Sequence, residues 1–168
     1  MNYDAATSPY FMERGTFIFV SLSLSMAFIL VGANLMAPTE PIEQDDRILE
    51  VCLQSHSHDL QHYHANLSIV IRGEGQVIPA ETGVIPGCMR GIHTHDDTGK
   101  LHIETPEAME ARLEHFFQIW EQPFTSTQLL DTTVGEGESI SLTVNGALVD
   151  NPQNHIIEDG QELVLTLA

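Results

Sequence analysis

The sequence predicts an α+β fold class: an N-terminal transmembrane helix, then one small domain in which a mixed, β-grasp-like sheet packs against one amphipathic helix. Three observations lead to this prediction. Residues 15–37 carry no charged side chain. Segments such as 62–71 alternate apolar and polar side chains with the two-residue period of half-buried strands. Residues 105–121, which follow the first strand segments, place apolar side chains at helical spacing. The order strands, helix, strands is typical of an α+β domain.

The uncharged segment 15–37 spans ~34 Å as a helix, enough for a hydrocarbon core of ~30 Å. A cleaved signal peptide is the alternative, but residues 1–14 hold two acids and one Arg, and Pro38 follows the candidate cleavage position. Because Arg14 is the only base near either end, the positive-inside rule places residues 1–14 in the cytoplasm and residues 38–168 outside. The sequence therefore predicts a single-pass protein of the cell membrane.

Residues 38–48 are acidic and contain two prolines, which predicts a linker before an extracytoplasmic domain over residues 49–168. The chain has two cysteines, Cys52 and Cys88. An even pair of cysteines in an oxidising compartment predicts a disulfide. The alternative is that Cys88 is a thiolate metal ligand, since it lies shortly before His93 in the sequence.

The strongly acidic composition bears on the class of partner. The formal net charge of -18 comes from 24 acidic and 6 basic side chains. Nucleic acids are bound mainly through Lys and Arg contacts to phosphates, so we expect no nucleic-acid partner. The same charge attracts cations, including metal ions.

Single strands are expected over residues 62–71, 76–80 and 162–168. Residues 92–104 are expected to form a hairpin with a loop around Gly99, in which His95 lies opposite His102 and His93 opposite Glu104. A second hairpin is expected at Asn145-Gly146, a dipeptide typical of type I′ turns.

The predicted helix begins at Thr105-Pro106, because Thr can cap a helix and Pro is tolerated at its first position. Apolar side chains at helical spacing are expected to face the core: Met109, Leu113, Phe116, Phe117 and Trp120. His115 lies off this stripe and is expected at the surface. His155 is expected in a loop, with no functional role.

Seven of the nine histidines lie in two short stretches, residues 55–64 and 92–104. Within them, side chains two positions apart lie on the same face of a strand, ~6.6–7 Å apart, a gap that a metal ion can bridge. The predicted metal ligands are His62, His64, His93, His95, His102 and Glu104. Imidazole suits copper and zinc. The alternative is an exposed strand face without ligand function. His56 and His58 lie in a less regular segment and are weaker candidates.

The sequence predicts no catalytic residue and no organic cofactor. Glu104 or Asp96 could act as the base of a zinc hydrolase, but the chain contains no HExxH, Gly-x-Ser-x-Gly or phosphate-binding glycine motif. Asp96 and Asp97 are instead expected in the turn of the hairpin.

Several segments resemble an uncharacterised group of membrane-anchored or secreted bacterial and archaeal proteins. These segments are HYHANLSI (62–69), VIPA (77–80), GC (87–88), IHTHDDTGKLHIE (92–104) and FFQIWEQPFTSTQLL (116–130). The resemblance covers roughly residues 52–168 and implies family motif positions at His62, His64, His93, His95, Asp96 and His102. It implies no particular activity, so the metal prediction depends on the spacing of the ligands.

Together these observations predict a membrane-anchored, extracytoplasmic protein that binds copper or zinc for metal capture, delivery or structural use. The alternative is a non-catalytic accessory subunit that docks into a larger membrane protein complex through its transmembrane helix.

Overall fold

The computed structural model describes residues 45–54 and 61–168. The strands of the main sheet are β1 (Gln61–Ile71), β2 (Glu74–Gln76), β5 (Ile92–His93), β6 (Lys100–Thr105), β9 (Ile140–Val144), β10 (Ala147–Val149) and β11 (Glu162–Leu167). Two small sheets pair β3 (Val84–Ile85) with β4 (Cys88–Met89) and β7 (Gln128–Leu129) with β8 (Thr132–Thr133). The helical elements are η1 (Arg47–Glu50), α2 (Leu113–Ile119) and η3 (Pro152–Asn154).

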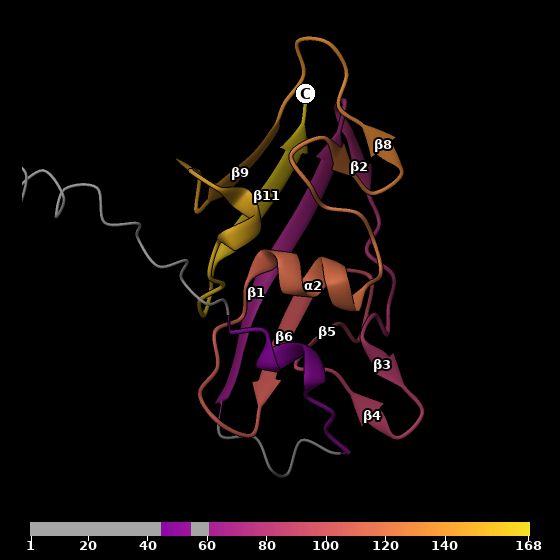
Figure 1. The fold of residues 1–168 in the computed structure, drawn as a ribbon, viewed down its shortest axis with the longest axis vertical. Helices are drawn as coiled ribbons and strands as arrows, with labels where there is room; N and C mark the ends of the chain where they lie inside the picture. Colours follow the sequence, from indigo (N-terminus) through magenta and orange to yellow (C-terminus); the bar gives the residue numbers. More distant parts are fainter. Residues whose placement is uncertain (1–44, 55–60) are drawn as a thin grey trace, which may run out of the picture. The chain divides into compact units, whose positions relative to one another are not determined.

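The main sheet is mixed, and β1 lies at its centre. The strand order is β10-β9-β11-β1-β6-β5, and β2 pairs with the end of β1 (Figure 1). β1 runs parallel to β11 and antiparallel to β6. Sequentially distant strands therefore meet in the middle of the sheet, and β6 lies between β1 and β5.

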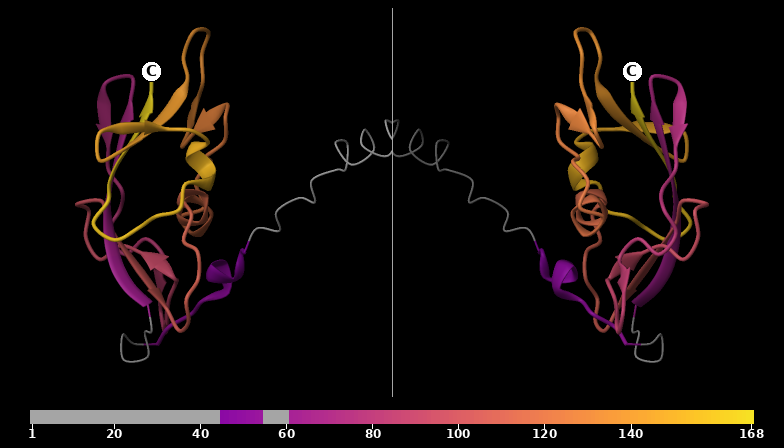
Figure 2. Two further views of the ribbon diagram at one scale, coloured as in Figure 1. Left: turned by 90° about the vertical axis from the view of Figure 1, so that its left-hand side faces the viewer. Right: turned by 90° about the vertical axis from the view of Figure 1, so that its right-hand side faces the viewer.

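One face of the sheet is apolar and forms the core. The buried side chains of β1 alternate with polar ones, and they continue across β6, β5 and β11. The members of this face include Ala65, Leu67, Ile69, Ile92, Leu101, Ile103, Leu163 and Leu165. α2 and η3 lie on the same side of the sheet (Figures 1 and 2). Since the other face of β1 and β6 carries histidines and other polar residues, the two-residue period predicted for β1 is confirmed.

The helix is shorter than predicted. It covers Leu113–Ile119, and the residues from Pro106 to Ala111 form no helix. Thr105 remains in β6, as the residue before a proline favours extended backbone. The following segment is fixed by tertiary contacts instead: the Met109 N–H donates to the Gln61 side-chain oxygen at 2.9 Å, and Arg112 forms a β-bridge with Ile156.

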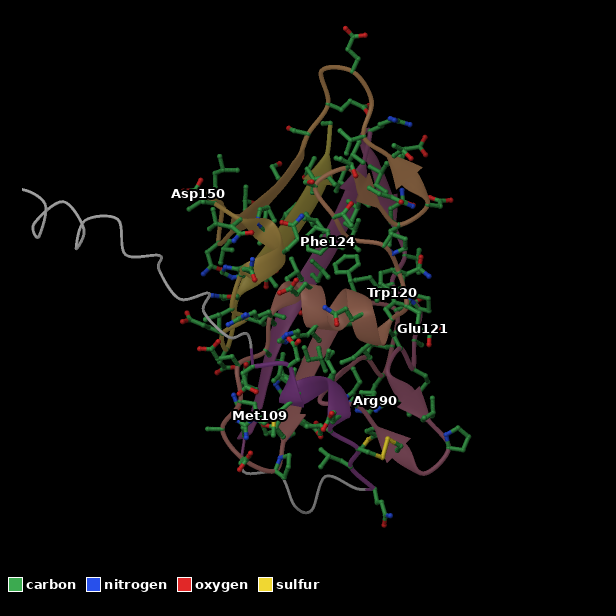
Figure 3. All side chains as sticks on the ribbon, in the orientation of Figure 1. Arg90, Met109, Trp120, Glu121, Phe124 and Asp150 are labelled. Carbon is green, nitrogen blue, oxygen red and sulfur yellow. A yellow bond between two sulfur atoms is a disulfide. The ribbon has the colours of Figure 1, made fainter. Side chains whose placement is uncertain are left out.

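Most of the predicted core side chains of the helix do reach the core. Leu113, Phe116 and Phe117 are fully buried, and Met109 and Trp120 pack partly buried against them. Figure 3 shows the side chains of Trp120 and Met109 beside α2 and near the lower end of β6 respectively. A two-turn helix of this kind is held by burial rather than by its own propensity.

Cys52 and Cys88 form a disulfide with their Cα atoms 5.0 Å apart, visible as a yellow bond in Figure 3. Beside it, the backbones of Leu53 and Met89 exchange hydrogen bonds of 2.9 and 2.8 Å. The cysteines are 36 residues apart, for which the chain-entropy model gives a stabilisation of ~3–4 kcal/mol. Because its sulfur is bonded to Cys52, Cys88 does not offer a thiolate to a metal.

The predicted fold class needs correction. Within residues 45–54 and 61–168, no helix is long and apolar enough to cross a membrane. The transmembrane helix expected over residues 15–37 lies outside the described residues, and the structure does not support it. What the structure supports for the described part of the chain is a mixed β-sheet with one short α-helix.

Candidate metal centre

The polar face of the sheet carries a row of three histidines, one from each of three neighbouring strands. His64 in β1 lies directly opposite His102 in β6, and His102 lies directly opposite His93 in β5. In the next row, His62 lies opposite Glu104. Side chains directly opposite one another in antiparallel strands point to the same face and are ~5 Å apart at Cβ. Strand pairing therefore gathers residues from two distant stretches of sequence.

The predicted register of the hairpin was wrong by two residues. His93, rather than His95, pairs with His102, and Glu104 pairs with His62 instead of His93. A shift of two residues keeps every side chain on its face, so the expected grouping of ligands survives the error. β5 ends at His93, and His95 lies in the loop that follows, with its ring centre 4.7 Å from that of His102.

The first histidine group consists of His62, His64 and His102, with Glu104 beside it. His64 Nε2 lies 3.3 Å from His62 Nε2 and 3.1 Å from His102 Nδ1. Glu104 Oε1 lies 3.2 Å from His62 Nε2 and 3.8 Å from His102 Nδ1. In a tetrahedral site with metal–nitrogen bonds of ~2.0–2.1 Å, ligand atoms are ~3.3–3.4 Å apart. The three histidines are therefore close enough together to be ligands of one metal ion, and the Glu104 carboxyl lies beside two of them.

The short nitrogen–nitrogen distances in this group cannot all be hydrogen bonds. Each imidazole nitrogen offers either one proton or one lone pair in the plane of its ring. His64 Nε2 has two other ring nitrogens within 3.3 Å, so it can complete a good hydrogen bond to one of them at a time. A cation placed among the three nitrogens would accept all three lone pairs at once.

The second histidine group consists of His93, His95 and His102, whose candidate ligand atoms lie within 4.8 Å of one another. His93 Nδ1 donates to the backbone carbonyl of Arg90 at 2.9 Å, and this bond fixes the ring so that Nε2 is the nitrogen left for a ligand role. His95 Nδ1 lies 4.0 Å from Glu81 Oε1. Neither Arg90 nor Glu81 belongs to a histidine motif, so no sequence pattern predicted their place beside the cluster.

The two groups share His102, and each has one outer histidine that solvent reaches. The Glu104 and His93 side chains are fully buried and that of His102 is 17% exposed, whereas those of His62 and His95 are 45% and 37% exposed. Solvent thus reaches the candidate centre at His62 and His95 but not at Glu104 and His93. An ion can reach it from solvent without any opening of the core.

Burial and neighbouring charges favour the uncharged form of His64 and His102 near neutral pH. Burial, followed by the nearby histidines His64, His95 and His93, lowers the pKa of His102 to about 4. Burial, followed by the positive charge of Lys100, lowers the pKa of His64. Neutral imidazoles carry the lone pairs that a metal needs. A bound cation would place a positive charge beside the buried carboxyl group of Glu104.

Asp96 serves the hairpin loop. Its Oδ1 accepts the Thr98 N–H at 3.0 Å and also the Thr98 hydroxyl, and these bonds hold the pKa of the Asp96 carboxyl below its ordinary value. This is the turn role expected from the sequence. Glu104, the other candidate base, belongs to the metal centre.

His115 is not at the surface, contrary to the sequence prediction. It is fully buried at the start of α2, where Nδ1 accepts the Arg112 backbone N–H at 3.2 Å and Nε2 faces Asp46 Oδ1 at 3.2 Å. It takes the place that Glu or Gln holds in a capping box. His155 lies after η3 with its ring beside Gln161. His56 and His58 lie outside the described residues.

Comparison of the chain with protein-family models, with curated proteins and with solved structures found no match.

Proposed function

We propose that this protein binds copper or zinc through its histidine cluster and serves to capture the ion from solution. The observation that carries the proposal is the first histidine group. The ring nitrogens of His62, His64 and His102 lie within 4.8 Å of one another, and His64 Nε2 lies 3.3 and 3.1 Å from the other two. The nearest of these distances are close to those between ligands of one tetrahedral ion, and the Glu104 carboxyl lies beside the group. The donor set of imidazole and carboxylate suits zinc and copper.

Capture is favoured over a purely structural role by the access to the cluster. Structural zinc sites are closed by four protein ligands in the interior. Here two of the outer histidines, His62 and His95, are exposed to solvent by more than a third. The apolar core on the opposite face of the sheet is complete without a metal. An ion bound to the cluster could therefore be loaded and exchanged while the fold persists.

The disulfide and the charge of the chain support a setting outside the reducing cytoplasm. Disulfides persist mainly in oxidising compartments. There the net charge of -18 would draw divalent cations toward the protein surface at moderate ionic strength.

The test is a calorimetric titration of the full-length, chelator-treated protein with Zn(II) and, separately, with Cu(II). The wild type should bind tightly, and His102→Ala should lose at least ~100-fold in affinity, since even residues that merely orient a ligand contribute 10–100-fold. The matched control is His155→Ala, which removes a histidine that belongs to neither group and should bind like the wild type. Circular dichroism would verify that each variant is folded. Equal affinity of the wild type and His102→Ala would refute the proposal.

A further inference from the structure

We infer that the cluster holds two metal ions, one in each histidine group, with the ring of His102 bridging them. The inference rests on the proposed function and adds to it a second site and a shared ligand. Both groups contain His102, and in each the candidate ligand atoms lie close enough to surround one ion.

The position of His102 in the sheet makes it a bridge. β6 lies between β1 and β5, so the ring of His102 has His64 on one side and His93 on the other. Its Nδ1 faces the first group, 3.1 Å from His64 Nε2. The lone pair of the second nitrogen, Nε2, diverges from that of Nδ1, and the ring centres of His95 and His93 lie 4.7 and 5.5 Å from that of His102. A single imidazole has one nitrogen for each of two ions, so we assign Nδ1 to the first group and Nε2 to the second.

The second group is prepared to receive an ion of its own. The carbonyl of Arg90 can only accept, so the bond of 2.9 Å places the proton of His93 on Nδ1 and the lone pair on Nε2. An outer hydrogen bond of this kind is the usual partner of a metal-bound histidine. Glu81 Oε1 lies 4.0 Å from His95 Nδ1, beyond hydrogen-bond distance, and places a carboxyl group beside the exposed member of the group. His93 contributes a buried ligand and His95 one that solvent reaches.

Binding of the second ion releases one proton. The first ion is coordinated by His62, His64 and His102 Nδ1, with Glu104, and the remaining ring proton of His102 is then on Nε2. The second ion replaces that proton, which passes to solvent, and His102 becomes an imidazolate with one negative charge. No electron is transferred. The imidazolate, Glu104 and Glu81 offset part of the charge of two divalent ions held close together.

The experiment uses Cu(II) as the probe and measures both stoichiometry and magnetism. The full-length wild type, stripped of metal, is titrated with Cu(II) and the bound copper is counted by elemental analysis after desalting. Two ions per chain are expected. His62→Ala and His95→Ala each remove an exposed member of one group, so each variant should keep one ion and remain folded. His155→Ala is the first control. The double variant His56→Ala/His58→Ala is the second, and it tests whether the two histidines outside the described residues contribute to the stoichiometry. Each of these controls should bind two ions.

Electron paramagnetic resonance separates a bridged pair from two independent ions. Copper ions joined by an imidazolate couple their unpaired electrons, so the integrated signal at the second equivalent should fall below that at the first. In His95→Ala the signal should rise to one equivalent and stay there. Two bound ions with a signal of full, doubled intensity would overturn the bridge.

The outcomes also separate this inference from the proposed function. One ion in the wild type that is kept in His95→Ala and lost in His62→Ala would overturn the second site and leave the single-metal proposal standing. No tight binding in the wild type would overturn both.

Discussion

The protein buries histidine in two regions, and the neighbours of the ring nitrogens differ between them. At the start of α2, each nitrogen of His115 meets a group of the opposite kind: Nδ1 accepts the Arg112 N–H, and Nε2 faces the carboxylate of Asp46. On the polar face of the sheet, His64 and His102 meet other imidazole nitrogens instead. Both nitrogens of His115 thus meet complementary groups of the fold, whereas nitrogens of the sheet histidines gather in two groups that share His102.

Burial of a histidine is therefore not in itself a sign of function. His115 and His93 are equally buried, but His115 completes a helix terminus and His93 belongs to a converging set. What distinguishes them is the chemistry of their neighbours. Complementary donors and acceptors indicate a structural role, and several lone-pair donors around one point indicate a cation site.

The largest expected effect concerns stabilisation by the metal. With Zn(II) at about 1,000 times its dissociation constant, the free energy of unfolding of the wild type should rise by about 4 kcal/mol. A folded His115→Ala variant should show the same gain, because His115 lies outside the cluster, while His102→Ala should show almost none. Differential scanning calorimetry with and without Zn(II) measures these differences. Loss of the gain in His115→Ala would mean that the two regions do not act separately.

The second effect concerns the structural histidine. Without metal, His115→Ala should lower the free energy of unfolding by about 2–3 kcal/mol, because it leaves a cavity and removes the acceptor of the Arg112 N–H. His155→Ala, at a half-buried loop position where one side-chain hydrogen bond to Gln161 is lost, should lower it by only about 0.5–1.5 kcal/mol. Urea unfolding at pH 7 with a chelator present measures both. If the two variants proved equally stable, the buried contacts of His115 would contribute nothing.

The smallest effect is the pH dependence of the metal-free protein. Burial and the neighbouring histidines hold the pKa of His102 at about 4 in the folded state, below the value of about 6.5 in the unfolded chain. As pH falls from 6.5 toward 4, the unfolded chain therefore takes up a proton that the folded protein does not, and stability is lost. The expected loss from this group is at most about 2 kcal/mol at pH 5.

This pH effect is isolated by comparing the wild type with His102→Asn in urea unfolding at pH 7 and pH 5. The variant should lose less stability than the wild type between the two values, because it has no titrating ring at that position. An identical loss in both proteins would show that His102 is not held neutral by its surroundings.

Much of the candidate site follows from local sequence alone. The period of a strand is two residues, so His62 and His64 share a face in any sheet that contains β1, as do His102 and Glu104 in β6. This parity survived an error of two residues in the hairpin register. The Asn145-Gly146 turn was also predictable, because both residues adopt the positive φ angles that this dipeptide tolerates.

Other features depended on contacts between distant segments. Local signals favoured a helix from Thr105, but Gln61 and Ile156 bind the backbone of the following segment and keep it out of the helix. His115 was predicted at the surface because it lies off the apolar stripe of the helix, and helical spacing does not report contacts with other segments. Its burial is produced by Asp46 and the segment around η1, which no periodicity in residues 105–121 can reveal.

The local sequence was enough to predict which side chains share a face of a strand, where the Asn145-Gly146 turn falls and which residues are candidate metal ligands. Only the tertiary structure decided that β6 lies between β1 and β5, and so that His102 has histidines on both sides. The physical reason is that side-chain parity is fixed by the geometry of one strand, whereas strand order is chosen by burial of the whole apolar face. The candidate ligands could be identified in the sequence, but their two groups form only when the strands are assembled in the sheet.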